Sequence, residues 1–161
     1  MTENTSLRTQ TFTWEDPMIG AQAARTLTGL EYMTKLMRGE LPAAPIAILM
    51  NMLAAEVEFG RIIFSAQPAE YHYNPLGIVH GGFAATLLDS ALGCAVHSTL
   101  PMGVGFSTLA LQVNYVRAIT SATGIVYCEG KVIHGGRRIA TAEARLTDGD
   151  GKLYAHGTTT C

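Results

Sequence analysis

Asp89 is the residue of this sequence whose type and setting most directly suggest chemistry. It is the only side chain with a formal charge between Glu70 and Arg117, in a run that is otherwise mostly apolar or small. Removing an unpaired carboxylate from water is costly unless the group is hydrogen-bonded, paired or protonated. Such a carboxylate can act as a general base on a water molecule, or it can attack an acyl carbon itself. The alternative is a structural carboxylate that accepts hydrogen bonds from backbone N–H groups.

The segment His80-Gly81-Gly82 lies where a loop is expected to become a helix. The first N–H groups of a helix have no partner within the helix, and they carry partial positive charge. Glycines at this point let another molecule approach the backbone closely. We therefore predict that Gly81 and Gly82 donate hydrogen bonds to a carbonyl oxygen that becomes an oxyanion. A plain helix start is the alternative interpretation.

Polar side chains on both sides of this helix could support such a site. Asn74 and His80 flank the preceding turn, where they can hold a water molecule, a substrate carbonyl or the loop itself. Ser107 and Thr108 follow the helix, and a hydroxyl group there could orient the carboxylate of Asp89 or the attacking water. Local hydrogen bonding explains each of these four residues equally well when it is considered alone.

The spacing of Asp89 and Gly82 has a consequence for assembly. The two residues lie seven positions apart, on nearly the same face of a helix, but about 10 Å apart along its axis. Within one chain they are too distant to act on the same carbonyl group. Two chains with antiparallel helices would place the helix start of one beside Asp89 of the other. The spacing therefore predicts a dimer with two sites at its interface.

The composition also favours association. The chain has 161 residues, of which 48% are hydrophobic and only 15% are charged, so a monomer would have little polar surface. The net charge of −2 provides no basic surface for nucleic acid. We therefore expect an oligomer, with a homodimer as the minimal unit, and no nucleic-acid partner.

Metal sites, disulfides and membrane insertion are not expected. Cys94, Cys128 and Cys161 lack the spacing of a disulfide framework or a zinc site, and the five histidines are scattered. No apolar run is long enough to span a membrane, and the polar start of the sequence has no signal-peptide pattern. A cytoplasmic protein without a metal or cofactor is the expectation.

The residue periodicities predict an α+β fold, in which one antiparallel sheet wraps around one buried helix. An N-terminal tail and helical extension is expected over 1–55, followed by a single domain over 56–161. Helices are predicted over 17–38, with a weak point at Gly29, and over 82–100, and a short apolar helix or turn over 45–52. The helix over 82–100 is apolar nearly all round and therefore buried. Strands are predicted over 56–67, 105–118, 124–134, 138–147 and 153–160.

The motif that links these residues is Asn74, five residues, His80-Gly81-Gly82, six residues and Asp89. It resembles the motif of the hotdog-fold acyl-CoA thioesterases of the PaaI type. Three later stretches are similar to the same family: Asn114 to Arg117, Gly135 to Arg137, and Asp148 to Gly151 followed by Tyr154 to Thr158. The resemblance extends from about residue 56 to the C-terminus.

This resemblance implies a hotdog fold, homodimers that share their active sites and pair into homotetramers, and hydrolysis of an acyl-CoA thioester to a free acid and CoA. It implies that Asp89 is the base or nucleophile and that the Gly81 N–H is the carbonyl donor. It further implies that Asn74 and His80 organise the loop, and that Ser107 or Thr108 lies near the carboxylate.

A CoA substrate would bring phosphate groups, for which arginine is the best-matched side chain. Arg137 and Arg138 follow Gly135-Gly136 at the expected start of a strand. Adjacent strand residues point to opposite faces, so one of the two arginines is expected to serve. A solvated basic turn is the alternative.

Two other functions remain open on the same fold. A non-catalytic acyl-CoA sensor would keep the pocket but would not need Asp89. A hydratase or dehydratase would pair a histidine with a carboxylate for proton transfer at carbon, and His80 with Asp89 offers such a pair.

Overall fold

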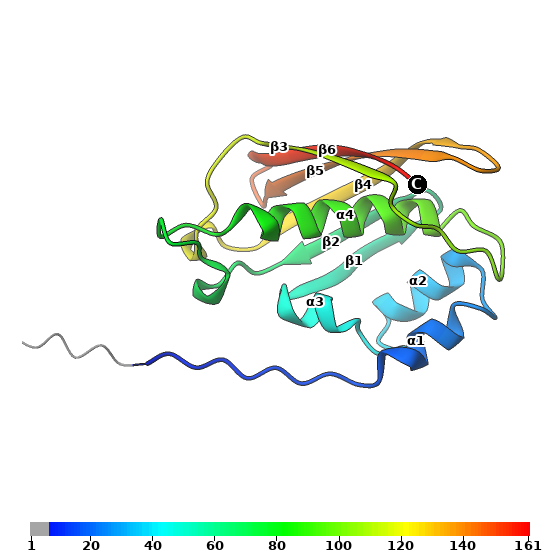
Figure 1. Ribbon diagram of the computed structural model, residues 1–161, viewed down its shortest axis with the longest axis horizontal. Helices are drawn as coiled ribbons and strands as arrows, with labels where there is room; N and C mark the ends of the chain where they lie inside the picture. Colours follow the sequence, from blue (N-terminus) through cyan, green and yellow to red (C-terminus); the bar gives the residue numbers. More distant parts are fainter. Residues whose placement is uncertain (1–6) are drawn as a thin grey trace, which may run out of the picture.

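A six-stranded antiparallel sheet and one long helix, α4 (Gly81–His97), form the centre of the protein (Figure 1). The computed structural model describes residues 7–161. The strand order is β1-β2-β4-β5-β6-β3, and α4 crosses one face of this sheet. The predicted arrangement of one sheet around one buried helix is confirmed. The strands are β1 (Met52–Glu58), β2 (Arg61–Ala66), β3 (Ala110–Tyr115), β4 (Val126–Gly135), β5 (Ala140–Asp148) and β6 (Leu153–Thr160).

Helix α4 is apolar on most of its surface because it packs against the concave face of the sheet. Leu87, Leu88 and Leu92 are completely buried. A narrower stripe, which includes Ala85 and Asp89, is only partly buried. This stripe is the part of α4 that the sheet leaves uncovered.

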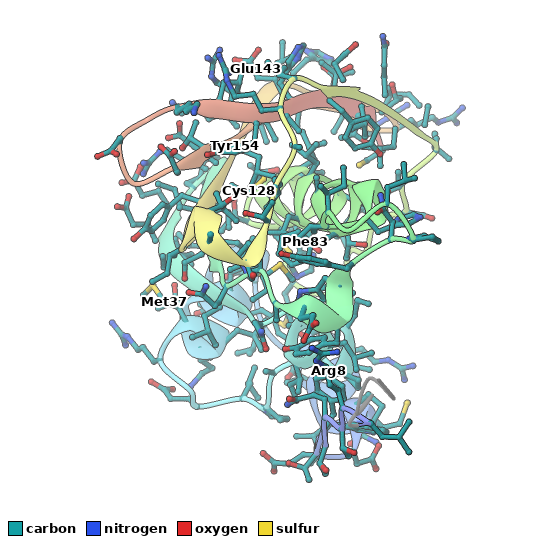
Figure 2. All side chains as sticks on the ribbon, turned by 90° about the vertical axis from the view of Figure 1, so that its left-hand side faces the viewer. Arg8, Met37, Phe83, Cys128, Glu143 and Tyr154 are labelled. Atoms are coloured by element: carbon teal, nitrogen blue, oxygen red, sulfur yellow. The ribbon has the colours of Figure 1, made fainter. Side chains whose placement is uncertain are left out.

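The strands alternate between buried and exposed positions, as strands with one buried face do. Cys128 in β4 and Phe83 in α4 lie in the interior, whereas Glu143 in β5 lies on the outer surface (Figure 2). Gly130 in β4 sets the close approach of the two layers. A Cβ atom there would lie 2.3 Å from the carbonyl oxygen of Ala91 in α4, so only glycine fits without a shift of the backbone.

The N-terminal segment forms three short helices, α1 (Pro17–Ala23), α2 (Gly29–Met37) and α3 (Pro45–Leu49). The prediction of one helix over 17–38 is therefore wrong. Thr28 starts α2 with a capping box, in which it bonds reciprocally with Glu31. The Gly29 N–H donates to the carbonyl oxygen of Leu100, and this tertiary contact separates α2 from α1.

The predicted strand over 56–67 is a hairpin. Strand β1 ends at Glu58, and the chain turns at Gly60, whose φ of 76° is one that glycine adopts easily. The Ser98 hydroxyl group accepts a hydrogen bond from the Gly60 N–H at 2.8 Å, which ties this turn to the end of α4. The expected limit between residues 55 and 56 lies inside β1.

The predicted strand over 105–118 is shortened to β3, because residues 105–109 form a loop over α4. The Phe106 ring in this loop would lie 2.6 Å from a Cβ atom at Gly93. The short 3-10 helices η1 (Glu70–His72) and η2 (Ser121–Thr123) lie in the remaining connections.

Residues 7–16 form no helix or strand, and the first six residues of the expected tail lie outside the described range. Arg8 pairs with Glu70 at 2.9 Å, and the Phe12 ring packs edge-on against Tyr71. None of the helices within residues 7–161 combines the length and the apolar character that a membrane crossing needs.

Candidate active site

Asp89 lies near the middle of α4, on the stripe that the sheet leaves uncovered. The Thr108 hydroxyl group donates a hydrogen bond to its Oδ1 atom at 2.9 Å. Among residues 7–161, no lysine, arginine or histidine forms a salt bridge with this carboxylate. Asp89 is therefore a partly buried carboxylate that is oriented by one hydroxyl group and keeps its second oxygen available.

Ser107, which we expected among the catalytic residues, lies away from Asp89. The Thr108 hydroxyl group bonds the carboxylate, whereas Ser107 is exposed and lines a cavity that does not include Asp89. Successive side chains of an extended segment point in opposite directions, so only one of the two hydroxyl groups reaches Asp89.

Cys94, five residues after Asp89 on α4, is the nearest candidate for a nucleophilic thiol, and its environment argues against that role. Burial, together with the negative charge of Asp89, raises the pKa of the Cys94 thiol to about 12. The thiol is therefore protonated at neutral pH, and it is inert as a nucleophile.

Asn74 holds the loop that leads into α4. Its Oδ1 atom accepts hydrogen bonds from the N–H groups of Leu76 at 2.9 Å and Ile78 at 3.4 Å. Its own N–H donates to the carbonyl oxygen of Ile78 at 2.8 Å. These bonds close a compact turn, which fixes the position of His80 at the start of the helix.

His80 caps α4, and in doing so it occupies one of the two predicted oxyanion donors. Its Nδ1 atom accepts a hydrogen bond from the Gly82 N–H at 2.8 Å, so the ring proton of neutral His80 lies on Nε2. The predicted bond from Gly82 to a substrate carbonyl stays a prediction, and it would have to replace this capping bond. The Gly81 N–H, in contrast, has no hydrogen-bond partner in the described part of the chain.

A cavity of about 320 Å³ lies next to this helix start and is lined by Asn74, His80, Gly81 and Tyr115, among others. A Cβ atom at Gly81 would lie 3.2 Å from the Tyr115 ring, so glycine leaves room for the backbone N–H to meet a ligand. Three of the predicted site residues therefore surround one cavity.

Four of the other predicted residues line a second cavity, of about 440 Å³, at the other end of α4, whereas Asp89, Gly82 and Thr108 line neither cavity. Ser107, Gly136, Arg137 and Arg138 all contribute to its lining. Both arginines are exposed, and neither forms a salt bridge within residues 7–161. The prediction that only one arginine would serve receives no support, because both line the same cavity.

A single chain does not bring Asp89 and the Gly81 N–H together. The residues are eight positions apart on α4, which corresponds to about 12 Å along the helix axis. The carboxylate and the free backbone donor therefore belong to different regions of one protomer.

Comparison with known proteins identifies the family. A family model described as the thioesterase superfamily matches residues 76–155, which include Gly81 and Asp89. A solved structure of a protein from the thioesterase superfamily is 32% identical to this chain, with a TM-score of 0.68, over 83% of this chain and 97% of that chain. The chain belongs to the thioesterase superfamily. It is therefore a member of a family of thioester hydrolases, as predicted.

Two further relatives of this thioesterase are informative. A phenylacetic acid degradation-related protein from Ralstonia eutropha JMP134, provisionally named a thioesterase, has a TM-score of 0.73 and 28% identity over 81% of this chain and 98% of that chain. A Halobacterium salinarum protein provisionally named an esterase is 42% identical over 69 residues, which are 42% of this chain and 44% of that relative. The predicted hotdog fold and PaaI-type resemblance are confirmed.

His72 is a residue of the thioesterase whose role the sequence did not reveal. Its Nδ1 atom accepts from the Ala69 N–H at 3.0 Å, so its Nε2–H donates to the carbonyl oxygen of Leu49 at 2.8 Å. Its own carbonyl oxygen accepts from the His80 N–H at 2.8 Å. His72 therefore connects α3 to the start of α4, and a histidine in a turn-rich segment carries no signal for such a role.

His97, at the C-terminal end of α4, is also unusual. Both ring nitrogens are buried, and neither has a hydrogen-bond partner in the described structure. The ring packs against Tyr32 and Phe106, with centroid separations of 5.3 and 5.7 Å. Burial lowers the pKa of His97, which keeps the side chain neutral at pH 7.

This histidine makes the thioesterase less stable in acid. A histidine whose pKa is lowered by folding binds more protons when the chain unfolds, so stability falls as the pH drops below the ordinary value of about 6.5. We expect His97→Phe to reduce the fall in Tm between pH 7.5 and pH 5.5, measured by thermal unfolding. The exposed His156→Phe is the matched control, and an equal effect of both variants would contradict the assignment to His97.

Within residues 7–161, no three His, Cys, Asp or Glu side chains gather as a group that could hold a metal ion. The groups that this site offers for chemistry are the carboxylate of Asp89 and the N–H groups at the start of α4.

Proposed function

We propose that this protein hydrolyses an acyl-CoA thioester to a free acid and CoA, at two sites shared between the protomers of a homodimer. Each site combines Asp89 of one protomer with the Gly81 N–H of the other. The observation that carries the proposal is the division of α4: it holds an oriented carboxylate at its middle and a free N–H donor at its start, about 12 Å apart on one chain.

The hydrolysis needs one group that receives a proton and one that stabilises negative charge. As general base, Asp89 takes a proton from water while the water oxygen adds to the thioester carbon. As nucleophile, Asp89 adds to this carbon itself, and water then cleaves the resulting anhydride. In both routes the Gly81 N–H donates to the carbonyl oxygen as it becomes an oxyanion, and CoA departs as a thiolate.

The sheet supports the dimer because β3 forms one of its edges. β3 pairs with β6 on one side only, and an edge strand can pair with a second copy of itself. Leu109, which directly precedes β3, and Tyr115, at its end, are 66% and 58% exposed. A twofold axis perpendicular to the sheet beside β3 would make both the β3 strands and the α4 helices antiparallel, and it would continue the sheet across the interface.

The arginine-lined cavity supports CoA as the carrier of the acyl group. Arg137 and Arg138 lie on the same side of α4 as Ser107, the neighbour of Thr108. Two guanidinium groups without carboxylate partners suit the phosphates of CoA. The dimer is the minimal unit of this proposal, and a tetramer remains a prediction.

A subunit-complementation assay tests the shared site. Asp89→Asn and Gly81→Pro each remove one half of the machinery, and the two variants are co-expressed with different affinity tags so that mixed dimers can be purified. Each variant alone is expected to be nearly inactive in thiol release from acyl-CoA. Before the mixed dimers are separated, the co-expressed population should recover about a quarter of the native activity. Half of its dimers are mixed, and each mixed dimer holds one intact site out of two.

The control is a chain that carries both substitutions, mixed with the native chain. In a shared-site dimer, every mixed dimer of this control is inactive. If instead the control mixture keeps active mixed dimers, and the complementing mixture recovers nothing, the site lies within one protomer. A native protein that binds acyl-CoA and hydrolyses none of it would favour the sensor function.

A further inference from the structure

A third cavity, of about 230 Å³, lies between the N-terminal helices and α4, and we call it the α2–α3 pocket. Figure 1 shows α2 and α3 beside β1, and the lining of the pocket joins these elements to α4. The pocket is lined by residues of all these elements, including Met33, Leu36, Ala47, Phe64, Ser90 and Cys94. Neither the carboxylate chemistry nor the CoA phosphates account for it.

Helix α4 contributes Ser90 and Cys94 to one wall of the α2–α3 pocket, whose lining does not include Asp89. Ser90 follows Asp89 directly and lies about 100° from it around the helix axis, and Cys94 lies one turn further along, on the same side as Ser90. Thr108, in the loop that precedes β3, donates its hydrogen bond to Asp89. The wall of the pocket therefore begins on the flank of α4 next to the one that carries Asp89.

We propose that the acyl group of the thioester lies in the α2–α3 pocket, and that α2 and α3 therefore set the acyl preference of the enzyme. This inference rests on the proposed thioester hydrolysis. It assigns the substrate class as acyl groups that are compact, apolar and uncharged.

The lining excludes charged acyl groups. Cys94 is its only side chain that can ionise, and burial raises the pKa of this thiol to about 12. The pocket thus offers no cation to a terminal carboxylate and no anion to an amine, and burying either charge without a partner is costly. The Ser90 hydroxyl group is the one strong hydrogen-bonding side chain in the lining.

The size of the pocket selects compact groups. A protein cavity of about 150 Å³ with an apolar lining holds a benzene molecule, so 230 Å³ accommodates an aromatic ring with a short linker or an aliphatic chain of similar volume. An acyl chain that is longer than the pocket would reach its rim at Ile46 and Leu53, which are 45% and 67% exposed. Carbons placed there remain in contact with water and contribute less to binding.

Volume changes in the wall test this inference. Ala47→Leu fills the pocket and Leu36→Ala enlarges it, while Ala21→Leu and Met37→Ala are matched controls outside the lining. The readout is kcat/KM across a series of straight-chain acyl-CoAs from four to sixteen carbons, with a dicarboxylic acyl-CoA included. A change of one methylene or more in such a pocket is worth about 10-fold or more in kcat/KM.

We expect the chain-length optimum to shift to shorter acyl groups in Ala47→Leu and to longer ones in Leu36→Ala, with both controls like the native enzyme. The dicarboxylic acyl-CoA should be the poorest substrate of its length. Profiles that fall uniformly at all lengths, with no shift of the optimum, would overturn the inference while the thioesterase activity stands.

A binding measurement separates this inference from the proposed hydrolysis. S-alkyl-CoA thioethers of the same chain lengths cannot be hydrolysed, and their affinities are measured by calorimetry. If native protein hydrolyses no acyl-CoA, the proposed function fails, and the same length shifts in thioether affinity still support the pocket. If all thioethers bind the native protein and both wall variants with equal affinity, the placement of the acyl group in the α2–α3 pocket is overturned.

Discussion

Asp89→Asn is expected to lower kcat for acyl-CoA hydrolysis by at least ~10²-fold, near the lower end of a general-base contribution. The asparagine side chain has the same size, and its carbonyl oxygen can still accept the hydrogen bond that Thr108 donates to Asp89. It cannot accept a proton or act as a carboxylate nucleophile, so the loss falls on the chemical step. The measurement is thiol release from a panel of acyl-CoAs under saturating substrate.

Two controls accompany this variant. Its Tm and its affinity for a non-hydrolysable thioether should match those of the native protein, because Asp89 forms no salt bridge within residues 7–161 that the substitution could break. A native kcat in the variant would make Asp89 a structural residue. No turnover by either protein, together with equal binding of acyl-CoA, would support the non-catalytic sensor.

Gly81→Pro is expected to lower kcat by about 10²- to 10³-fold, the usual cost of losing one oxyanion donor. Proline removes the backbone N–H and is well tolerated at the first position of a helix, which Gly81 occupies in α4. The preceding residue, His80, has φ −60° and ψ 138°, an extended conformation that a following proline favours. The substitution therefore removes the donor and preserves the helix start.

Gly81→Ala is the matched control, because alanine keeps the N–H group. Both variants place a Cβ atom about 3.2 Å from the Tyr115 ring, so any steric effect on the cavity appears in each of them. We expect the kcat of Gly81→Ala to stay within a few-fold of the native value, whereas the kcat of Gly81→Pro falls by about 10²- to 10³-fold. Equal losses in both variants would assign the effect to crowding against Tyr115 rather than to the lost donor.

Much of the candidate site could be predicted from the sequence, because its signals are local. A carboxylate alone in an apolar helix marks Asp89 as a costly residue wherever the helix lies. The first N–H groups of a helix have no partner within the helix, which marks Gly81 and Gly82 together as possible donors. The buried helix and the later strands also follow from periodicity, which is a property of neighbouring residues.

The predicted helices and strands were wrong where a contact with a residue distant in sequence decides the local structure. Gly29 starts a new helix because its N–H bonds to Leu100, and Gly60 turns a hairpin that Ser98 holds. Neither partner is near in sequence, so a helix over 17–38 and a strand over 56–67 fitted the periodicity equally well.

Only the tertiary structure shows which backbone N–H groups and hydroxyl groups of the candidate site have hydrogen-bond partners and which are free. His80 takes the Gly82 N–H and leaves that of Gly81, and Thr108 rather than Ser107 bonds Asp89. Each outcome depends on the direction of a single side chain, and residue type and spacing do not determine that direction. The α2–α3 pocket is likewise a product of packing, because its walls come from segments that meet only when the chain has folded.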